Sequence, residues 1–143
     1  MKVLALDLGD KHTGVAISDA LGITSQPLTT LATALLNTEL GLLLEKEGIE
    51  SVVVGYPKTL RGTISKQTET ATKQFEELKK QFPKYSWHLW DERLTSKSAN
   101  SIMRTNKKNK KNKKPKDKLK VHAVAAALIL QSYLEYLKYH KDA

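Results

Sequence analysis

The stretch LALDLGDKHTGVAISD, residues 4–19, decides the fold of this chain of 143 residues. Residues 3–8 form a short apolar run without polar alternation, which predicts a central strand that is buried on both faces. Turn residues follow at 9–11, and residues 12–19 predict a second strand. Because the connection is so short, we expect the two strands to form a hairpin, with Asp7 at the end of the first strand.

The rest of the chain alternates strands and helices. Strands are expected within residues 22–31, where Pro27 favours the edge of a sheet, and at residues 49–56 and 84–90. Helices are expected from Asn37 or Thr38 as the cap to Gly48, over residues 63–81, from Thr95 or Ser96 through Met103, and over residues 119–137. Three strands in a row, followed by alternating helices and strands, predict an α/β fold with a mixed sheet and helices on its faces.

The composition suits one domain, residues 1–143. Hydrophobic residues make up 40% of the chain, enough for a core that needs neither disulfides nor metal to fold. Cysteine is absent, which excludes disulfides, thiolate zinc sites and cysteine nucleophiles and is compatible with a reducing compartment. The first apolar run is too short for a signal peptide or a membrane span, so we expect a soluble cytoplasmic protein.

Positive charge is concentrated in one segment. The net charge is +9, yet residues 107–120 alone hold nine lysines and one aspartate, so the rest of the chain is close to neutral. A basic segment on a neutral body favours a polyanion partner, most simply a nucleic acid. The simpler alternative is a solvated loop that keeps the protein in solution. The lysine and asparagine content of residues 105–118 predicts a mobile basic loop.

Asp7 is the first candidate for chemistry. A carboxylate at the end of a buried strand costs several kcal/mol unless a partner compensates it, and a divalent metal ion is such a partner. Gly9 leaves room for whatever approaches Asp7. The alternative is an aspartate that caps its own turn through backbone N–H groups.

Two further candidates follow later in the chain. The tripeptide Asp91-Glu92-Arg93 comes after the Trp-rich strand and could bind a metal and a phosphate side by side, or form a local ion pair. His122 stands early in the last helix, where it is either a metal ligand or an ordinary boundary residue. The other histidines, His12, His88 and His140, form no recognisable zinc spacing.

In the strand at 84–90, Trp87 and Trp90 fall on opposite faces. One is expected in the core. The other either packs under a helix, which we favour, or stacks on a base.

Four segments together resemble the YqgF/RuvX family, whose members are described as pre-16S rRNA nucleases and as Holliday junction resolvase-like proteins. They are LALDLGDKHTGVAISD at residues 4–19, VVVGYPKTLRGT at 52–63, WDERLTS at 90–96 and AVAAALILQSYLE at 123–135. They are spread over nearly the whole chain, in the same order and at the same spacing as in the family. The resemblance implies a ribonuclease H-like fold: a five-stranded mixed sheet, its second strand antiparallel, flanked by helices.

The resemblance also implies a catalytic site made by Asp7, the pair Asp91-Glu92 and a residue early in the last helix. Relatives are expected to have an aspartate at that last position, and this chain has His122. Neutral imidazole can hold a metal ion or position a water, so the departure is compatible with catalysis.

The hypothesis that follows is a metal-dependent nuclease with two Mg²⁺ or Mn²⁺ ions about 4 Å apart, which would activate a water and stabilise the charge on the phosphoryl oxygens and the leaving group. Asp7 would bridge the ions and Glu92 would hold one of them, with Asp91 as a further candidate. His122 would complete the other ion's ligand set. Flanking phosphates would be bound by Arg93, Thr63, Lys107, Lys108, Lys110 and Lys111, although Thr63 could equally cap its helix.

Other functions remain open at this point. The D-L-G-x-x-x-T-G pattern also resembles the first phosphate loop of actin-like ATPases and sugar kinases, but those enzymes need two such domains. A nucleic-acid-binding module without catalysis is a second rival, because the basic loop alone would support binding. If the protein is a nuclease, we favour precursor rRNA over branched DNA as its substrate. Resolution of a junction needs a dimer, and the sequence shows no apolar stripe that would form a dimer interface, so we expect a monomer.

Overall fold

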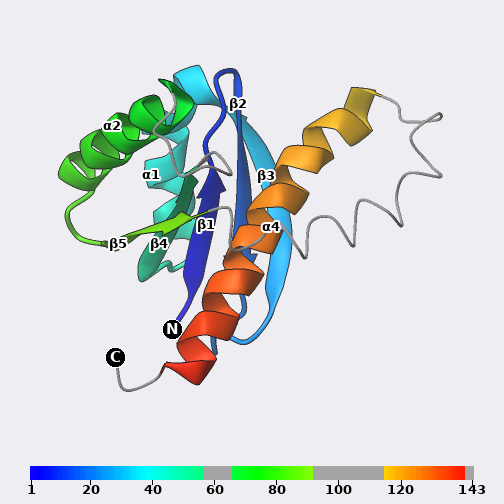
Figure 1. Cartoon of the computed structure of the whole chain (residues 1–143), viewed down its shortest axis with the longest axis vertical. Coiled ribbons are helices and arrows are strands. Elements are labelled where there is room, and N and C mark those ends of the chain that lie inside the picture. The colour runs from blue at the N-terminus through cyan, green and yellow to red at the C-terminus, as the bar shows by residue number, and fades with distance from the viewer. Residues whose placement is uncertain (57–65, 92–114, 141–143) are drawn as a thin grey trace.

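A five-stranded mixed sheet forms the centre of the computed structural model, which describes residues 1–56, 66–91 and 115–140 (Figure 1). The described elements are β1 (Val3–Asp7), β2 (His12–Ser18), β3 (Ser25–Ala32), the 3₁₀ turn η1 (Thr33–Leu35), α1 (Leu36–Lys46), β4 (Ser51–Tyr56), α2 (Lys66–Gln81), β5 (Ser86–Asp91) and α4 (Pro115–Tyr139). Helices α1 and α2 cover one face of the sheet, and α4 covers the other.

The strand order is β3-β2-β1-β4-β5. β2 is antiparallel to β1 and to β3, whereas β1, β4 and β5 are parallel to one another. The predicted α/β class, the mixed sheet and its antiparallel second strand are therefore confirmed. Pro27 lies in β3, at an edge of the sheet as predicted. An edge strand has no neighbour on its outer side, so a residue without an N–H is tolerated there.

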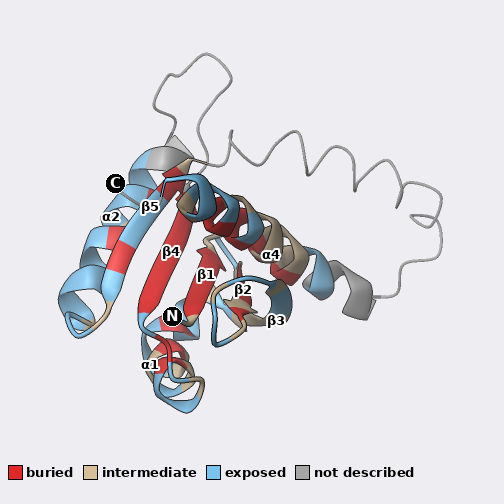
Figure 2. Cartoon of the chain, turned by 90° about the horizontal axis from the view of Figure 1, so that it is seen from below, coloured by how far each residue is buried: buried red, intermediate tan, exposed pale blue. Residues whose placement is uncertain are grey.

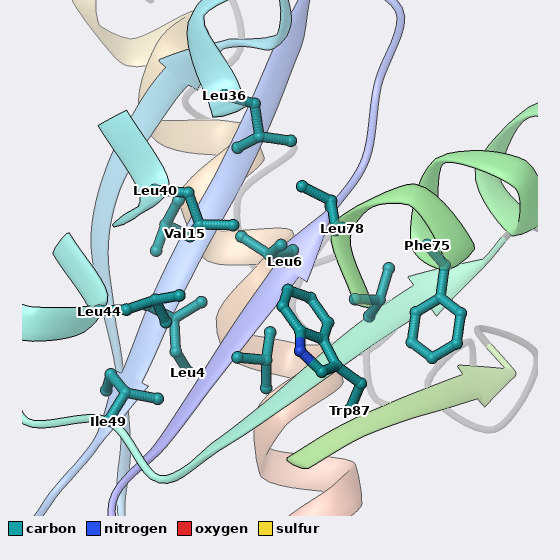
Figure 3. Close-up of a cluster of buried hydrophobic side chains, with 12 residues drawn as sticks. Leu4, Leu6, Val15, Leu36, Leu40, Leu44, Ile49, Phe75, Leu78 and Trp87 are labelled. Carbon is teal, nitrogen blue, oxygen red and sulfur yellow. The ribbon is translucent and has the colours of Figure 1, made fainter. Parts of the chain in front are cut away.

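The two faces of the sheet bury different clusters, because side chains alternate along each strand. The face toward α1 and α2, called here the α1/α2 face, includes Leu4 and Leu6 of β1, and Figure 3 shows Leu6, Leu40 and Trp87 pointing into this cluster. The face toward α4, called the α4 face, includes Val3 and Ala5 of the same strand. Figure 2 shows β1 and β4 buried between the two helical layers.

The two tryptophans of β5 lie on opposite faces, as predicted. Trp87 packs on the α1/α2 face, where its Nε1 donates a hydrogen bond of 2.8 Å to the carbonyl of Phe82. Trp90 packs on the α4 face. Both side chains are only 9% exposed, so packing explains both of them.

The predicted cap of α1 is wrong. The helix begins at Leu36, directly after η1, and no side chain caps it at Leu35. Asn37 and Thr38 lie inside its first turn instead. The preceding 3₁₀ turn continues straight into the helix and takes the place of a separate polar cap. The predicted end is confirmed, because Gly48 adopts the left-handed φ of 63° after the last turn.

The boundary between the basic loop and the last helix also differs from the prediction. α4 begins at Pro115, so residues 115–118 are helical and not part of a loop. Proline suits the first position of a helix, where its missing N–H costs nothing and its φ is already helical. The remainder of the predicted loop, the predicted helix at 95–103 and Thr63 lie outside the described residues. No helix in the described part of the chain is long and apolar enough to span a membrane.

Candidate functional site

The carboxyl ends of β1, β4 and β5 meet at one edge of the sheet, because the three strands are parallel. Asp7 ends β1 and pairs in register with Gly55 of β4, which pairs in turn with Trp90 of β5. Asp7 is partly buried. In α/β sheets this edge is where ligand-binding groups gather.

Helix α4 reaches this edge through a close contact with Gly14. Gly14 of β2 is the residue directly opposite Asp7 in the antiparallel pair. A Cβ added at Gly14 would overlap the carbonyl group of His122 and would stand 2.9 Å from the backbone nitrogen of Ala123. The helix backbone therefore rests directly on the strand, which only glycine permits at this position.

Asp7 and this part of α4 lie on the same face of the sheet. Val3 and Ala5 belong to the cluster on the α4 face, and alternation along β1 assigns Asp7 to that face too. Opposite residues of an antiparallel pair lie about 4.5–5.5 Å apart between Cα atoms. The backbone of His122 therefore lies over the strand next to the one that Asp7 ends, at the position directly opposite Asp7.

Asp91 is placed differently. It ends β5 and pairs in register with Tyr56. Trp90 belongs to the α4 face, so alternation assigns Asp91 to the α1/α2 face, together with Trp87. The structure thus places Asp7 and Asp91 at one edge of the sheet but on opposite faces. Glu92 and Arg93, the next two residues, lie outside the described part of the chain.

His12 is a residue of this region that sequence reasoning set aside. Its ring stacks on the ring of His122, with centroids 5.5 Å apart and an interplanar angle of 29°. His12 begins β2, two positions before Gly14, so it shares the α4 face. Strand alternation alone assigns His12 and Gly14 to one face of β2, but it does not indicate the contact with His122.

The turn that carries His12 is fixed by Thr33. The Thr33 hydroxyl donates to the carbonyl of Gly9 at 2.7 Å, and its N–H donates to the carbonyl of Lys11 at 2.9 Å. The hydroxyls of Thr13 and Thr33 are also hydrogen-bonded, at 2.9 Å. Gly9 itself has no room for a side chain, since a Cβ there would overlap the carbonyl of His12. The hairpin is therefore a rigid support for the His12 ring.

The donors at this edge suit a divalent cation in kind. Asp7 offers a carboxylate, which suits Mg²⁺ and Mn²⁺, and His122 offers an imidazole, which suits transition-metal ions. Within the described ranges, however, no group of three His, Asp or Glu residues could hold a metal ion. A full ligand set needs a further residue, for which Glu92 is the predicted candidate. The predicted phosphate ligands Thr63, Lys107, Lys108, Lys110 and Lys111 also lie outside the described residues.

A similar fold occurs in a solved structure that holds a Holliday junction substrate. RuvC of T. thermophilus, solved in complex with a Holliday junction substrate, superposes with a TM-score of 0.66 and covers 98% of this chain and 96% of its own. The sequences are 13% identical, so the likeness is one of fold. It confirms the predicted ribonuclease H-like architecture.

Sequence relatives are much more similar. A protein of Koribacter versatilis is 41% identical and one of Rubrobacter xylanophilus is 37% identical; each alignment covers 94% of this chain, with 86% and 92% of the relative. Both bear the name "Putative pre-16S rRNA nuclease". The family model described as "RuvX: Holliday junction resolvase" matches residues 1–136. The chain therefore belongs to the RuvX family.

Proposed function

We propose that this protein is a metal-dependent nuclease that processes the 5′ end of precursor 16S rRNA. The names of its relatives supply the substrate, and the edge of the sheet described above supplies the site. The observation that carries the proposal is the close contact of α4 with Gly14, the residue directly opposite Asp7. This contact holds the helix that bears His122 beside the strand that ends in Asp7.

The proposed roles follow from the chemistry of each group. Asp7, Glu92 and His122 would hold one or two Mg²⁺ or Mn²⁺ ions. Such ions, when bound, supply Lewis-acid stabilisation of the phosphoryl oxygens and a more acidic water. Asp91 lies on the opposite face from Asp7, so the second carboxylate is assigned to Glu92 and not to Asp91.

Substrate binding is assigned to the positive charge. The lysines among residues 107–120 and Arg93 would bind phosphates flanking the scissile bond. Lysine binds phosphate without reading base edges. Specificity would therefore come from the shape of the folded RNA.

Replacing Asp7 by Asn tests the site. The variant keeps the size of the side chain and removes its charge, so cleavage of a precursor rRNA fragment with Mn²⁺ or Mg²⁺ should fall by more than the roughly 10–100-fold typical of losing an outer partner of a metal site. Asp10→Asn is the matched control, because Asp10 lies three residues further on, exposed in the same hairpin turn. Unchanged cleavage by a clean Asp7→Asn preparation would remove the assignment.

A second pair of variants tests the choice between neighbouring carboxylates. Glu92→Gln should lose cleavage as Asp7→Asn does, whereas Asp91→Asn should retain most of it, because of the face on which Asp91 lies. The reverse result would transfer the ligand role to Asp91 and would contradict the assignment made from alternation.

The substrate is tested by offering a four-way DNA junction beside the RNA fragment. The family description names a Holliday junction resolvase, so junction cleavage is the specific competitor. Symmetric resolution needs two active sites and hence a dimer, whereas RNA trimming needs one. We propose a monomer acting on RNA; faster cleavage of the junction by a species that light scattering shows to be dimeric would overturn this. Binding of both substrates without any cleavage would support a non-catalytic module instead.

A further inference from the structure

We propose that His12 is a positioning residue of the site, and that its ring sets the direction in which the ring nitrogens of His122 face. This inference rests on the proposed function, in which His122 is a metal ligand. It begins from the stacking of the two imidazoles, with centroids 5.5 Å apart and planes inclined by 29°. The two residues come from different elements, β2 and α4, and are far apart in the sequence.

The His122 ring needs such a support. It is only partly buried, on a helix whose close contact with the sheet is made by backbone atoms and not by the His122 side chain. A histidine side chain can adopt several rotamers, and holding one of them costs conformational entropy. A flat ring stacked against one side of the imidazole restricts these rotamers in advance. The restriction is useful only if the ring must present a nitrogen in one direction, as a metal ligand does.

His12 is suited to be the fixed member of the pair. It lies in a strand that is hydrogen-bonded on both sides, to β1 and β3, and its register partner in β3 is Ala32. The preceding turn is tied to Thr33 through the carbonyls of Gly9 and Lys11. The backbone that carries the His12 ring is therefore held in place by the sheet and by Thr33.

The same geometry argues against His12 as a ligand in its own right. Nearly parallel rings face each other and do not converge on one point. In keeping with this, Asp7, His12 and His122 are not among any described group of three that could hold a metal ion. The role assigned to His12 is thus to act through His122, in the way that outer partners orient the ligands of metal sites.

The test measures Mn²⁺ binding by the intact protein, first without substrate. The chain has four histidines, so the ring signals of all four can be followed by NMR after histidine labelling. Mn²⁺ should broaden the signals of His122 strongly and those of His140 little, and calorimetry gives the affinity. His12→Ala should weaken Mn²⁺ binding by roughly tenfold, the lower end of the effect of outer partners. His12→Phe keeps a flat ring and should restore most of the affinity.

The matched control is His140→Ala. His140 is also a histidine stacked on a neighbouring ring, that of Tyr136, with centroids 4.2 Å apart, but it follows the last residue of α4, at the opposite end of the helix from His122. Its removal should leave Mn²⁺ affinity unchanged. If His12→Ala does not fold, His12→Leu replaces it, because leucine fills space without offering a flat ring. In cleavage assays, His12→Ala should lower kcat at subsaturating Mn²⁺ and regain it at high Mn²⁺, while the KM for RNA stays constant.

Two results would overturn the proposal, and they are distinguishable. If His12→Ala binds Mn²⁺ as tightly as the unmodified protein while His122 is still broadened, the positioning role fails and the nuclease proposal stands. If Mn²⁺ leaves the His122 signals sharp in the unmodified protein, the ligand role of His122 fails, and the role of His12 fails with it.

Discussion

The two faces of the sheet are built from different side chains. The α1/α2 face is filled by large apolar residues, among them Leu40, Leu44 and Trp87, and its contacts are between side chains (Figure 3). The α4 face also holds large side chains such as Trp90, but β1 and β2 carry the small residues Ala5 and Ala16 there, and at Gly14 the helix backbone touches the strand directly. His12 and Asp7 stand at the end of the α4 face where the helix approaches Gly14.

If the proposed site is correct, this difference separates stability from function within one small sheet. Large side chains bury the most apolar area and so contribute most of the hydrophobic stabilisation. Small residues contribute less, but they let a helix approach closely enough to hold its side chains beside a strand end. A substitution on one face should therefore affect stability alone, and a substitution on the other should affect both stability and cleavage.

Gly14→Ala should have the largest effect. The added methyl group would overlap the carbonyl of His122, and backbone atoms cannot turn aside as a side chain can. The free energy of unfolding should fall by more than the about 1–3 kcal/mol typical of overpacking, and cleavage should fall to background. Urea unfolding and the RNA assay measure the two losses.

Gly41→Ala is the control for Gly14→Ala. Gly41 lies in α1, and the nearest atom to its added Cβ belongs to the side-chain ring of Phe82, at 3.0 Å, and not to backbone. The gain in helix propensity, up to about 1 kcal/mol, should offset the tight contact. Equal losses of stability and cleavage from the two glycine substitutions would show that the close contact of α4 with β2 has no special role.

Leu44→Ala should lower the free energy of unfolding without affecting the candidate site. Leu44 is fully buried on the α1/α2 face, and its truncation leaves a cavity that costs about 3 kcal/mol. The site lies across the sheet, so cleavage per folded molecule should be unchanged well below the melting temperature. A loss of cleavage in the fully folded variant would contradict the separation of the two faces.

The sequence predicted the strands of the sheet better than it predicted the starts of α1 and α4. Apolar runs such as that of β4 are local signals, and burial on both faces leaves little choice of partner element. The start of α1 was missed because a 3₁₀ turn replaced the expected polar cap. The first turn of α4 was missed because lysine content was given more weight than Pro115 at the first helical position.

Two features of the candidate site depend on tertiary structure. The contact of His12 with His122 joins β2 to α4, and no local pattern in either segment specifies the other. The face of Asp91 was within reach of the sequence, because Trp87 and Trp90 had already been assigned to opposite faces. Asp91 was nevertheless kept as a further candidate ligand beside Glu92, although strand alternation assigns Asp91 to the face opposite Asp7.

Ser18→Ala should have a moderate effect, since it tests a polar group at the other end of β2. The buried Ser18 hydroxyl accepts a hydrogen bond of 2.8 Å from the N–H of Val3. Its removal leaves that buried N–H without an acceptor, which costs about 1–3 kcal/mol. Ser25→Ala should cost less, because the hydroxyl of Ser25 donates to a carbonyl inside α4, that of Ala127, which also serves the helix ladder. Equal losses in urea unfolding would contradict this account.

The smallest effect is expected from the pH dependence of stability at His88. His88 lies on the α4 face of β5 against the ring of Tyr133, with centroids 5.7 Å apart, and burial lowers its pKa below the usual 6.5. The unfolded chain then binds a proton more readily than the folded protein, so stability is complete above about pH 6.5 and falls as the pH drops through that value. His88→Asn should make the free energy of unfolding depend less on pH between about pH 5 and pH 8. Tyr133→Phe keeps a ring over His88 and should retain the pH dependence of the free energy of unfolding. If His88→Asn leaves that pH dependence unaltered, His88 is protonated equally in the folded and unfolded states, and other groups cause the dependence.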